Sequence, residues 1–378
     1  MKTILILGGY GNFGKRISES LCTIPNIRLL ISGRNLSKAN RLIDILREHA
    51  CSDLKAAVLD IYDKDFDAKL KDLSVDIVVH TCGPFQGQDY LVALACIRVG
   101  AHYIDLADGR EFVCGIACLD QLAKEKKLLI VSGASSVPGL SSTVVDHFQE
   151  QFVSIDSIDI AIAPGNKAER GEATVRAILS YTGLPFSVFT GGQWKSVFGW
   201  MDPERIDIGG IVGKRWLANV DVPDLALFPE RYKVKDRVSF KAGLELSFLH
   251  LCMVIMAFLC KIGLVKNWAA MTKLIVKMSN WFIHFGTDQG GMQVKINGLS
   301  LAGKAKEIIW DLYADKGVGP YIPTISTIIL VKKLIDDDIQ QVSALPCMGL
   351  HQLQEFETYI QEMDIETKIT INEEELNG

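Results

Sequence analysis

A glycine-rich turn between an apolar strand and a helix constrains this chain more than any other feature. Ile4–Leu7 is continuously apolar, and Gly9, Gly11 and Gly14 follow it with the spacing G-x-G-x-x-G. Apolar residues then recur with helical spacing, and a second apolar segment, Ile27–Ile31, comes next. A strand, a glycine turn, a helix and a second strand within about 30 residues predict a βαβ unit.

Each glycine has a physical reason to be in such a turn. Gly9 lets the chain turn sharply off the strand, Gly11 lets the backbone approach a pyrophosphate, and Gly14 lets the helix pack closely on the sheet. The free N–H groups at the helix start would face the phosphates. We therefore predict a dinucleotide site; the alternative is a tight turn without a ligand. The predicted contacts from this turn are Gly9, Tyr10, Gly11, Asn12, Phe13 and Gly14.

The end of the second strand indicates which dinucleotide is bound. An acidic residue here would hold the ribose 2′-hydroxyl of NAD. This chain has Ser32 and Arg34 instead, and a guanidinium can pair with a 2′-phosphate. We predict NADP(H) in preference to NAD(H). An NAD-specific enzyme with Arg34 as a solvated surface residue remains the alternative.

Strands and helices keep alternating to about residue 150. Six apolar strands predict an N-terminal Rossmann domain, residues 1–150, with a doubly wound parallel sheet. Ligands bind such sheets at the carboxyl ends of the strands. That rule adds Asp60, Cys82, Gly83 and Pro84 to the predicted cofactor contacts and draws attention to Asp105 and Asp108, which follow the fifth strand.

The length of 378 residues favours a second domain. We predict that residues 151–344 form an α/β domain with a mixed open sheet, including a strand pair that turns at Asn297-Gly298. A helix at about 345–363 is expected to return to the first domain. Ile365–Ile371 should form an edge strand, and residues 373–378 should be disordered.

A hydrophobic segment, 244–285, interrupts this second domain. It contains 15 residues without formal charge between Glu245 and Lys261, which is shorter than the roughly 20 that a spanning helix needs. We expect apolar helices here. Three interpretations remain open: a buried hairpin or homodimer contact, a wall over a lipid-like substrate, and attachment to a membrane surface.

Composition excludes several classes of protein. The formal net charge of −5 argues against a nucleic-acid binder. Nine cysteines without a Cys-x-x-Cys pair argue against a zinc site and for a reducing, cytoplasmic location, with no metal expected. No P-loop motif and no G-x-S-x-G motif is present, which disfavours P-loop NTPases and serine hydrolases of the nucleophile-elbow type.

The sequence as a whole resembles the saccharopine dehydrogenase family, in its saccharopine dehydrogenase-like oxidoreductase branch. The resemblance implies a nicotinamide-dependent oxidoreductase with a Rossmann domain and a second α/β domain. It leaves the substrate open, since no arginine cluster suited to the carboxylates of saccharopine is evident. The segments that carry it are Gly8–Gly14, Ser32–Arg34, Val79–Phe85, His102–Val113, Gly133–Ser141, Phe285–Val294, Gly319–Ile325 and Ala344–Phe356.

Hydride transfer needs a group that manages one proton. We predict Asp105, Asp108 and Tyr321 for the chemistry. The predicted function is NAD(P)H-dependent hydride transfer to or from a C=N or C=C bond of a small or lipid-like substrate. The alternative is a dinucleotide-binding, membrane-associated scaffold or redox sensor without turnover.

Overall fold

The computed structural model describes residues 1–374, and the chain forms two compact units. Unit 1 comprises Met1–Leu140 and Tyr321–His351, and unit 2 comprises Ser141–Pro320 and the chain from Gln352 onward. The first unit therefore ends ten residues before the predicted boundary at 150. It is discontinuous, as expected, but the returning segment differs from the predicted one.

Unit 1 is built on a parallel sheet with the strand order β15-β6-β5-β4-β1-β2-β3. Every pair of neighbouring strands in it is parallel. The order reverses between β1 and β4, which defines the switch point of a doubly wound Rossmann sheet. The strands are β1 (Lys2–Leu7), β2 (Ile27–Gly33), β3 (Asp53–Val58), β4 (Ile77–His80), β5 (His102–Asp105), β6 (Leu129–Ser132) and β15 (Ser343–Pro346).

Helices follow the strands as the sequence predicted. The apolar strands and the inner faces of these helices form a core that includes Leu5, Val78, Ala95, Tyr103 and Ile130. The helices are α1 (Asn12–Leu21), α2 (Leu36–Leu46), α3 (Phe66–Asp72), α4 (Leu91–Val99), α5 (Arg110–Gly115), α6 (Asp120–Lys126) and α12 (Ile322–Ile335).

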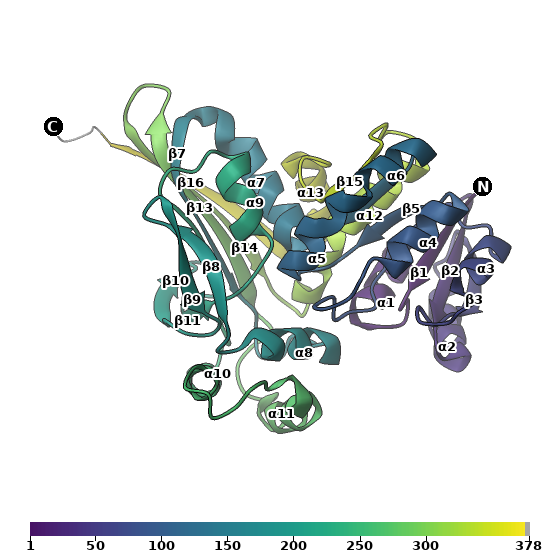
Figure 1. The fold of residues 1–378 in the computed structure, drawn as a ribbon, viewed down its shortest axis with the longest axis horizontal. Helices are drawn as coiled ribbons and strands as arrows, with labels where there is room; N and C mark the ends of the chain where they lie inside the picture. The colour runs from purple at the N-terminus through teal and green to yellow at the C-terminus, as the bar shows by residue number, and fades with distance from the viewer. Residues whose placement is uncertain (375–378) are drawn as a thin grey trace. The chain divides into compact units, whose positions relative to one another are not determined.

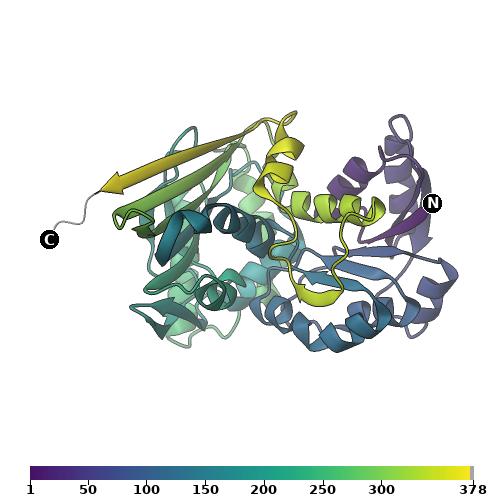
Figure 2. The same ribbon diagram turned by 90° about the horizontal axis from the view of Figure 1, so that it is seen from above.

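The C-terminal return to unit 1 consists of α12 and the strand β15. Helix α12 packs on α1, and β15 adds a parallel strand next to β6; both appear in green-yellow beside the N-terminal elements (Figures 1 and 2). The predicted return of a helix at 345–363 is wrong. The helix there, α13 (Leu353–Ile360), belongs to unit 2 and packs on α7 (Ser141–Phe148).

Unit 2 has a mixed open sheet with the order β10-β11-β12-β7-β13-β14-β16, to which β8 and β9 attach beside β12. Strands β7 and β12 are parallel, whereas β13 is antiparallel to both of its neighbours. The strands are β7 (Phe152–Ala163), β8 (Pro185–Thr190), β9 (Gln193–Phe198), β10 (Glu204–Asp207), β11 (Lys214–Asn219), β12 (Arg237–Ala242), β13 (Gly290–Ser300), β14 (Ala305–Ala314) and β16 (Ile365–Glu374).

The predicted turn at Asn297-Gly298 is wrong. β13 runs through both residues, and the chain reverses after Ser300, where Gly303 has a φ of +77°. Gly298 is needed because β7 passes close by: a Cβ at Gly298 would lie 2.1 Å from the Ser154 carbonyl oxygen. The pair of strands itself, β13 and β14, forms as expected.

The C-terminal strand β16 lies at the edge of the sheet, as predicted, and pairs with β14. It continues through Glu374, so the prediction of disorder is wrong for Glu373 and Glu374. Residues 375–378 lie outside the described residues.

The hydrophobic segment of unit 2 forms the helices α10 (Ser247–Lys261) and α11 (Thr272–Ser279). Figure 1 shows both in green at the foot of the unit. Helix α10 contacts β11, and α11 packs on α8 (Glu172–Tyr181), while α9 (Asp224–Arg231) packs on β12. Among residues 1–374, no helix is both long enough and apolar enough to cross a bilayer.

Candidate dinucleotide site and the groups beside it

The glycine turn after β1 is held by its own backbone. The Gly9 N–H donates to the Ser32 carbonyl (2.9 Å), and the Gly11 N–H donates to the Gly8 carbonyl (2.8 Å). A Cβ at Gly14 would lie 2.2 Å from the Gly8 oxygen, which no real side chain could tolerate. Gly14 therefore lets α1 start directly against the turn, as the sequence predicted.

The glycine turn is open beside Gly11. A Cβ on Gly11 would have a single close neighbour, the Gly8 oxygen at 3.0 Å. Helix α1 begins after Gly11, which has no side chain to cap it, and the first turn contains no acidic residue. Phe13 and Asn12 occupy that first turn. An anion there would meet unshielded N–H groups and the positive end of the helix.

Tyr10 joins this turn to the end of β2. Its hydroxyl accepts a hydrogen bond from the Asn35 N–H (2.9 Å), and its ring lies over Gly33, where a Cβ would come within 2.5 Å of the hydroxyl. Arg34 lies between these two residues and is exposed. The structure thus places Arg34 where the sequence predicted, beside the glycine turn.

Ser32, predicted as a cofactor contact, instead stabilises the glycine turn. Its side chain is fully buried, and its hydroxyl donates to the Ile6 carbonyl (3.0 Å). Because its carbonyl also receives the Gly9 N–H, Ser32 positions the turn and does not present its hydroxyl to a ligand.

The end of β4 packs against the same turn through Thr81, which the sequence analysis overlooked. The Thr81 hydroxyl donates to the Leu7 carbonyl (2.8 Å), and a Cβ on Gly8 would lie 2.7 Å from its oxygen and 3.0 Å from the Cys82 sulfur. Burial raises the pKa of Cys82 to about 12 although the Arg34 guanidinium opposes the shift, and Asp60 raises it further. The thiol is therefore protonated and serves as a packing group.

The backbone after β4 is held by a second side chain that the sequence analysis missed. The Gln88 amide donates to the carbonyls of Cys82 (2.9 Å) and Pro84 (2.7 Å). It fixes the path of Cys82, Gly83 and Pro84. Neither Thr81 nor Gln88 has a signature recognisable in sequence, because their role depends on carbonyl groups brought together by folding.

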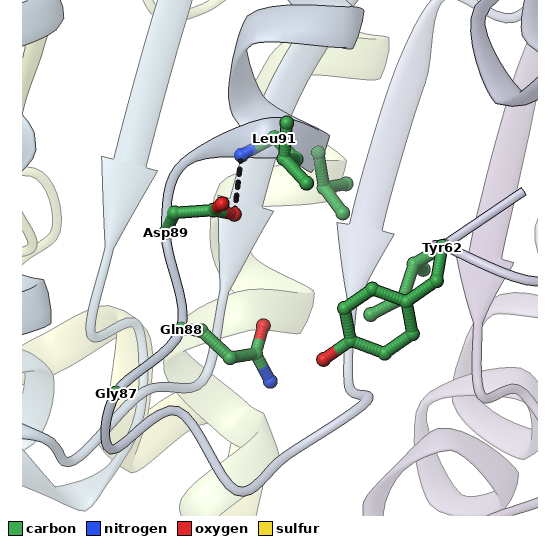
Figure 3. Close-up of a pocket in the computed structure, with 7 residues that line it drawn as sticks. Tyr62, Gly87, Gln88, Asp89 and Leu91 are labelled. Atoms are coloured by element: carbon green, nitrogen blue, oxygen red, sulfur yellow. Dashed lines mark hydrogen bonds between the residues drawn. The ribbon is translucent and has the colours of Figure 1, made fainter. Parts of the chain in front are cut away.

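A small hollow of about 90 Å³ lies beside this loop (Figure 3). The Gln88 amide and the Tyr62 hydroxyl face it from two loops, and Tyr62 follows Asp60, whose carboxylate accepts the Tyr62 N–H (3.1 Å). At roughly 30 Å³ per water molecule, it holds a few waters and not a nucleotide. The residues that line it are Ile61, Tyr62, Gly87, Gln88, Asp89, Leu91 and Val92.

Asp105, at the end of β5, is fully buried. Its Oδ1 accepts hydrogen bonds from the N–H groups of Ala107 and Gly133 (both 2.8 Å) and from the Ser132 hydroxyl (2.9 Å). Burial raises its pKa to about 6, although these hydrogen bonds oppose the shift. Asp105 ties together the chain exits from β5 and β6, so its predicted contact with a substrate is not supported by its placement.

Two other buried polar groups of this sheet, His80 and Tyr103, contact each other. The His80 Nδ1 and the Tyr103 hydroxyl are 3.0 Å apart, and both side chains are at most 1% exposed. Burial lowers the pKa of His80 to about 3, so it is a neutral core histidine.

Asp108 differs from Asp105 because it is only partly buried. Its Oδ1 accepts a hydrogen bond from the Gln86 amide (3.1 Å), a partner that the sequence analysis did not identify. Burial raises its pKa, while the Gln86 hydrogen bond opposes that shift. Asp108 therefore keeps a proton to a higher pH than an ordinary aspartate does.

Tyr321 does not join these carboxylates. It precedes α12, and its hydroxyl donates to Glu19 Oε2 on α1 (2.8 Å), while the Arg16 guanidinium lies 5.1 Å from the centre of its ring. The three residues predicted for the chemistry thus have separate partners: Asp105 in the core, Asp108 with Gln86, and Tyr321 with α1. In the described part of the chain, no group of three or more His, Cys, Asp or Glu side chains could hold a metal ion.

The fold and the glycine turn define a Rossmann-type dinucleotide-binding unit joined to a second unit with a mixed sheet. Residues 4–130 match the family described as "Saccharopine dehydrogenase NADP binding domain". The match covers about a third of the chain, and for these residues it confirms the resemblance found in the sequence. No curated protein sequence matches the chain significantly.

One solved structure supports the fold over nearly the whole chain. The apo saccharopine dehydrogenase (L-Glu forming) of Saccharomyces cerevisiae matches 98% of this chain and 100% of its own, with a TM-score of 0.69 and 12% identity. At that identity the likeness establishes the architecture. Short-chain dehydrogenases match in part: one from Mycobacterium ulcerans (TM-score 0.27, 20% identity, 35% of this chain and 66% of that one) and one from Oenococcus oeni (TM-score 0.28, 17% identity, 35% and 74%).

Proposed function

We propose that this chain is an NADP(H)-dependent oxidoreductase that transfers hydride to or from a C=N or C=C bond of a small or lipid-like substrate. The observation that carries the proposal is the open glycine turn at the start of α1, where a Cβ on Gly14 has no room and the space over Gly11 is free. When bound, the nicotinamide supplies the hydride; the protein's task is to hold and orient it and to manage a proton.

The cofactor preference rests on Arg34. Tyr10 and Asn35 fix the backbone on either side of it, and Arg34 itself is exposed. A guanidinium can bind a phosphate with two parallel hydrogen bonds and can stack on an adenine ring. An NADP 2′-phosphate at the end of β2 would receive this contact, whereas the 2′-hydroxyl of NAD finds no carboxylate in Ser32-Gly33-Arg34.

The proton is best assigned to Asp108. Asp105 is enclosed and Tyr321 is bonded to Glu19, whereas Asp108 is partly exposed and burial raises its pKa. A raised pKa brings a carboxyl group closer to the pH range in which it can both donate and accept a proton. Gln86 would orient it through the 3.1 Å hydrogen bond.

Calorimetric titration of the full-length protein with NADPH and with NADH tests the cofactor assignment. We expect tighter binding of NADPH in the wild type. We expect Arg34→Asp to weaken NADPH binding about tenfold or more, because a repulsive charge replaces the phosphate partner. Arg41→Asp, which makes the same change of charge on the exposed side of α2, is the matched control and should leave binding nearly unchanged.

Two results would contradict the assignment. Equal affinity of the wild type for NADH and NADPH would show that Arg34 does not read the 2′-phosphate. The absence of heat with all four oxidised and reduced coenzymes would remove the oxidoreductase proposal altogether. Tight NADPH binding without NADPH oxidation across a panel of imines, enones and unsaturated lipids would instead favour a dinucleotide-binding sensor or scaffold.

A further inference from the structure

The segment 246–287 of unit 2, which we call the apolar lobe, exposes an unusual amount of hydrophobic surface. On α10 the side chains of Phe248, Leu251, Ile255 and Phe258 are between 46% and 57% exposed. Their spacing of three, four and three residues puts them on one face of the helix. Monomeric proteins rarely leave a contiguous apolar patch of this kind uncovered unless it binds something.

The exposed face of α10 is not the face on which the helix packs. His250, Met253, Ala257 and Cys260 are buried and are spaced in the same way, two residues further along the chain. The helix therefore has two apolar stripes. One is used for folding of the unit, and the other is left for contact outside it.

Helix α11 and the turn that follows it repeat the pattern. Leu274, Met278 and Trp281 are 50%, 47% and 67% exposed and share one face by their spacing. The two parts of the lobe are in contact. The ring centroids of Phe248 and Phe282 lie 4.9 Å apart, and the Trp268 indole N–H donates to the Met256 carbonyl (2.9 Å). The exposed stripes thus belong to one structural element.

The charge of the lobe points to its partner. Residues 246–287 contain four lysines, Lys261, Lys266, Lys273 and Lys277, and no Asp or Glu. The lobe therefore carries +4 with neutral histidines, whereas the whole chain carries −5 and the remainder consequently −9. All four lysines are exposed. Exposed apolar side chains interspersed with lysines are typical of helices that lie in the interface of an anionic bilayer.

A buried carboxylate anchors both ends of the lobe. Glu245 directly precedes the lobe, and its carboxylate accepts hydrogen bonds from the N–H and the hydroxyl of Thr287, the last residue of the lobe (both 2.9 Å). The same carboxylate accepts the N–H of Asn166, outside the lobe (2.7 Å). The Asn166 amide donates to the carbonyls of Phe282 and Phe285 (2.7 and 2.9 Å). A lobe held at both ends can keep its apolar stripes presented without unfolding.

We propose that the apolar lobe docks on the surface of an anionic phospholipid bilayer. Phe248, Leu251, Ile255, Leu274, Met278 and Trp281 would enter the boundary between headgroups and acyl chains, and the lysines would remain among the headgroup phosphates. The helices would lie on the membrane, because no helix in the described residues can span it. This inference goes beyond the proposed hydride transfer and does not depend on it.

Charge also disfavours a second copy of the chain as the partner. A symmetric dimer through this face would place the same patch on both subunits and would bring two sets of four lysines together, with no acidic residue in either lobe to compensate. An anionic lipid surface supplies the missing negative charge.

Co-sedimentation of the full-length protein with vesicles tests the proposal. We expect binding to vesicles of phosphatidylcholine mixed with phosphatidylglycerol, weakened by raised salt, and much weaker binding to pure phosphatidylcholine. The variant Ile255→Glu/Trp281→Glu should partition at least ~10-fold less, because each charge would enter the apolar boundary. Lys273→Glu/Lys277→Glu should lose binding to the anionic vesicles by ~10-fold or more.

The controls separate this effect from misfolding and from net charge. Ile45→Glu/Ile369→Glu alters two exposed isoleucines outside the lobe (63% and 45% exposed), and Lys64→Glu/Lys126→Glu alters two exposed lysines of unit 1. Both variants should bind like the wild type. Trp281→Phe should still sediment while losing most of the blue shift of tryptophan fluorescence on anionic vesicles. Unchanged far-ultraviolet circular dichroism and thermal unfolding would show that each variant is folded.

Three outcomes would overturn the proposal. The first is a lack of sedimentation of the wild type, and the second is equal binding to neutral and anionic vesicles. The third is a wild-type dimer in analytical ultracentrifugation that Ile255→Glu/Trp281→Glu converts to a monomer, without vesicle binding by either; the lobe would then be a contact between copies. NADPH binding, measured separately, reports on unit 1 and remains independent of all three.

Discussion

Two glycines of the turn after β1 should respond in opposite ways to the same small change. Replacing Gly14 by Ala puts a Cβ 2.2 Å from the Gly8 oxygen, and a normal contact would need the helix start to move by about 1 Å. Overpacking of this kind costs about 1–3 kcal/mol. The melting temperature of the apo-protein should fall by about 2–4 °C for each kcal/mol.

Replacing Gly11 by Ala should leave stability almost unchanged. Gly11 has a φ of −76° and a ψ of −179°, which any residue adopts, and the new Cβ meets only the Gly8 oxygen, at 3.0 Å. Alanine in a compatible conformation even adds about 0.4–1 kcal/mol by restricting the unfolded chain, which offsets the tight contact. The methyl group would, however, stand where we expect the pyrophosphate to approach.

The assay is therefore a pair of measurements on each variant: thermal unfolding without cofactor, and calorimetric titration with NADPH. Gly11→Ala should melt close to the wild type and bind NADPH at least ~10-fold more weakly, a loss of ~1.4 kcal/mol. Gly14→Ala should melt lower. If Gly11→Ala binds NADPH with the affinity of the wild type, the phosphates do not lie over this turn, and the proposed dinucleotide site is wrong.

Two further predictions concern side chains of unit 1. Burial raises the pKa of Asp105 from 3.8 to about 6. Between these two pH values the folded protein therefore binds more protons than the unfolded chain does. The protonated carboxyl contributes its full stabilisation below about pH 4, and this stabilisation is lost as the pH rises through 6. Urea unfolding should show the free energy of unfolding of the wild type falling by up to about 3 kcal/mol relative to Asp105→Asn between pH 4 and 7, and a difference that does not depend on pH would contradict the burial argument. Tyr321→Phe should lower the free energy of unfolding by about 1 kcal/mol through the lost hydrogen bond to Glu19 and leave the NADPH affinity unchanged. A double-mutant cycle with Glu19→Gln should show a coupling energy of about 0.5–1.5 kcal/mol. Additive effects of the two substitutions would return Tyr321 to the candidates for proton transfer.

The parts of unit 1 that could be predicted are those determined by local sequence. The apolar runs and the glycine spacing predicted β1, α1 and β2 to within a few residues. This was possible because β2, the sheet neighbour of β1, is separated from it in the sequence by a single helix. The strand β15 was missed because Ser343–Pro346 is only four residues long and gains its partner, β6, from residues more than 200 positions earlier in the chain.

The candidate site shows the same division. Arg34 could be placed from sequence because it follows β2 directly. The position of Asp105 at the end of β5 could be predicted, but not whether its carboxylate faces solvent or the three donors from Ala107, Ser132 and Gly133. The partner of Tyr321 was out of reach, since Glu19 is 302 residues away in the chain.

The positions and pKa shifts of the side chains at the strand ends of unit 1 reduce the number of candidate proton donors. A donor must be reachable by substrate and must hold a proton that it can release near neutral pH. Cys82 fails because its pKa lies at about 12, His80 because burial keeps it neutral with a pKa of about 3, and Asp105 because it is enclosed. Asp108 remains, because the residue is partly exposed and burial raises the pKa of its carboxyl group. If hydride transfer occurs at the switch point of the unit 1 sheet, the loop after β5 is therefore the part of that unit from which the proton is best supplied.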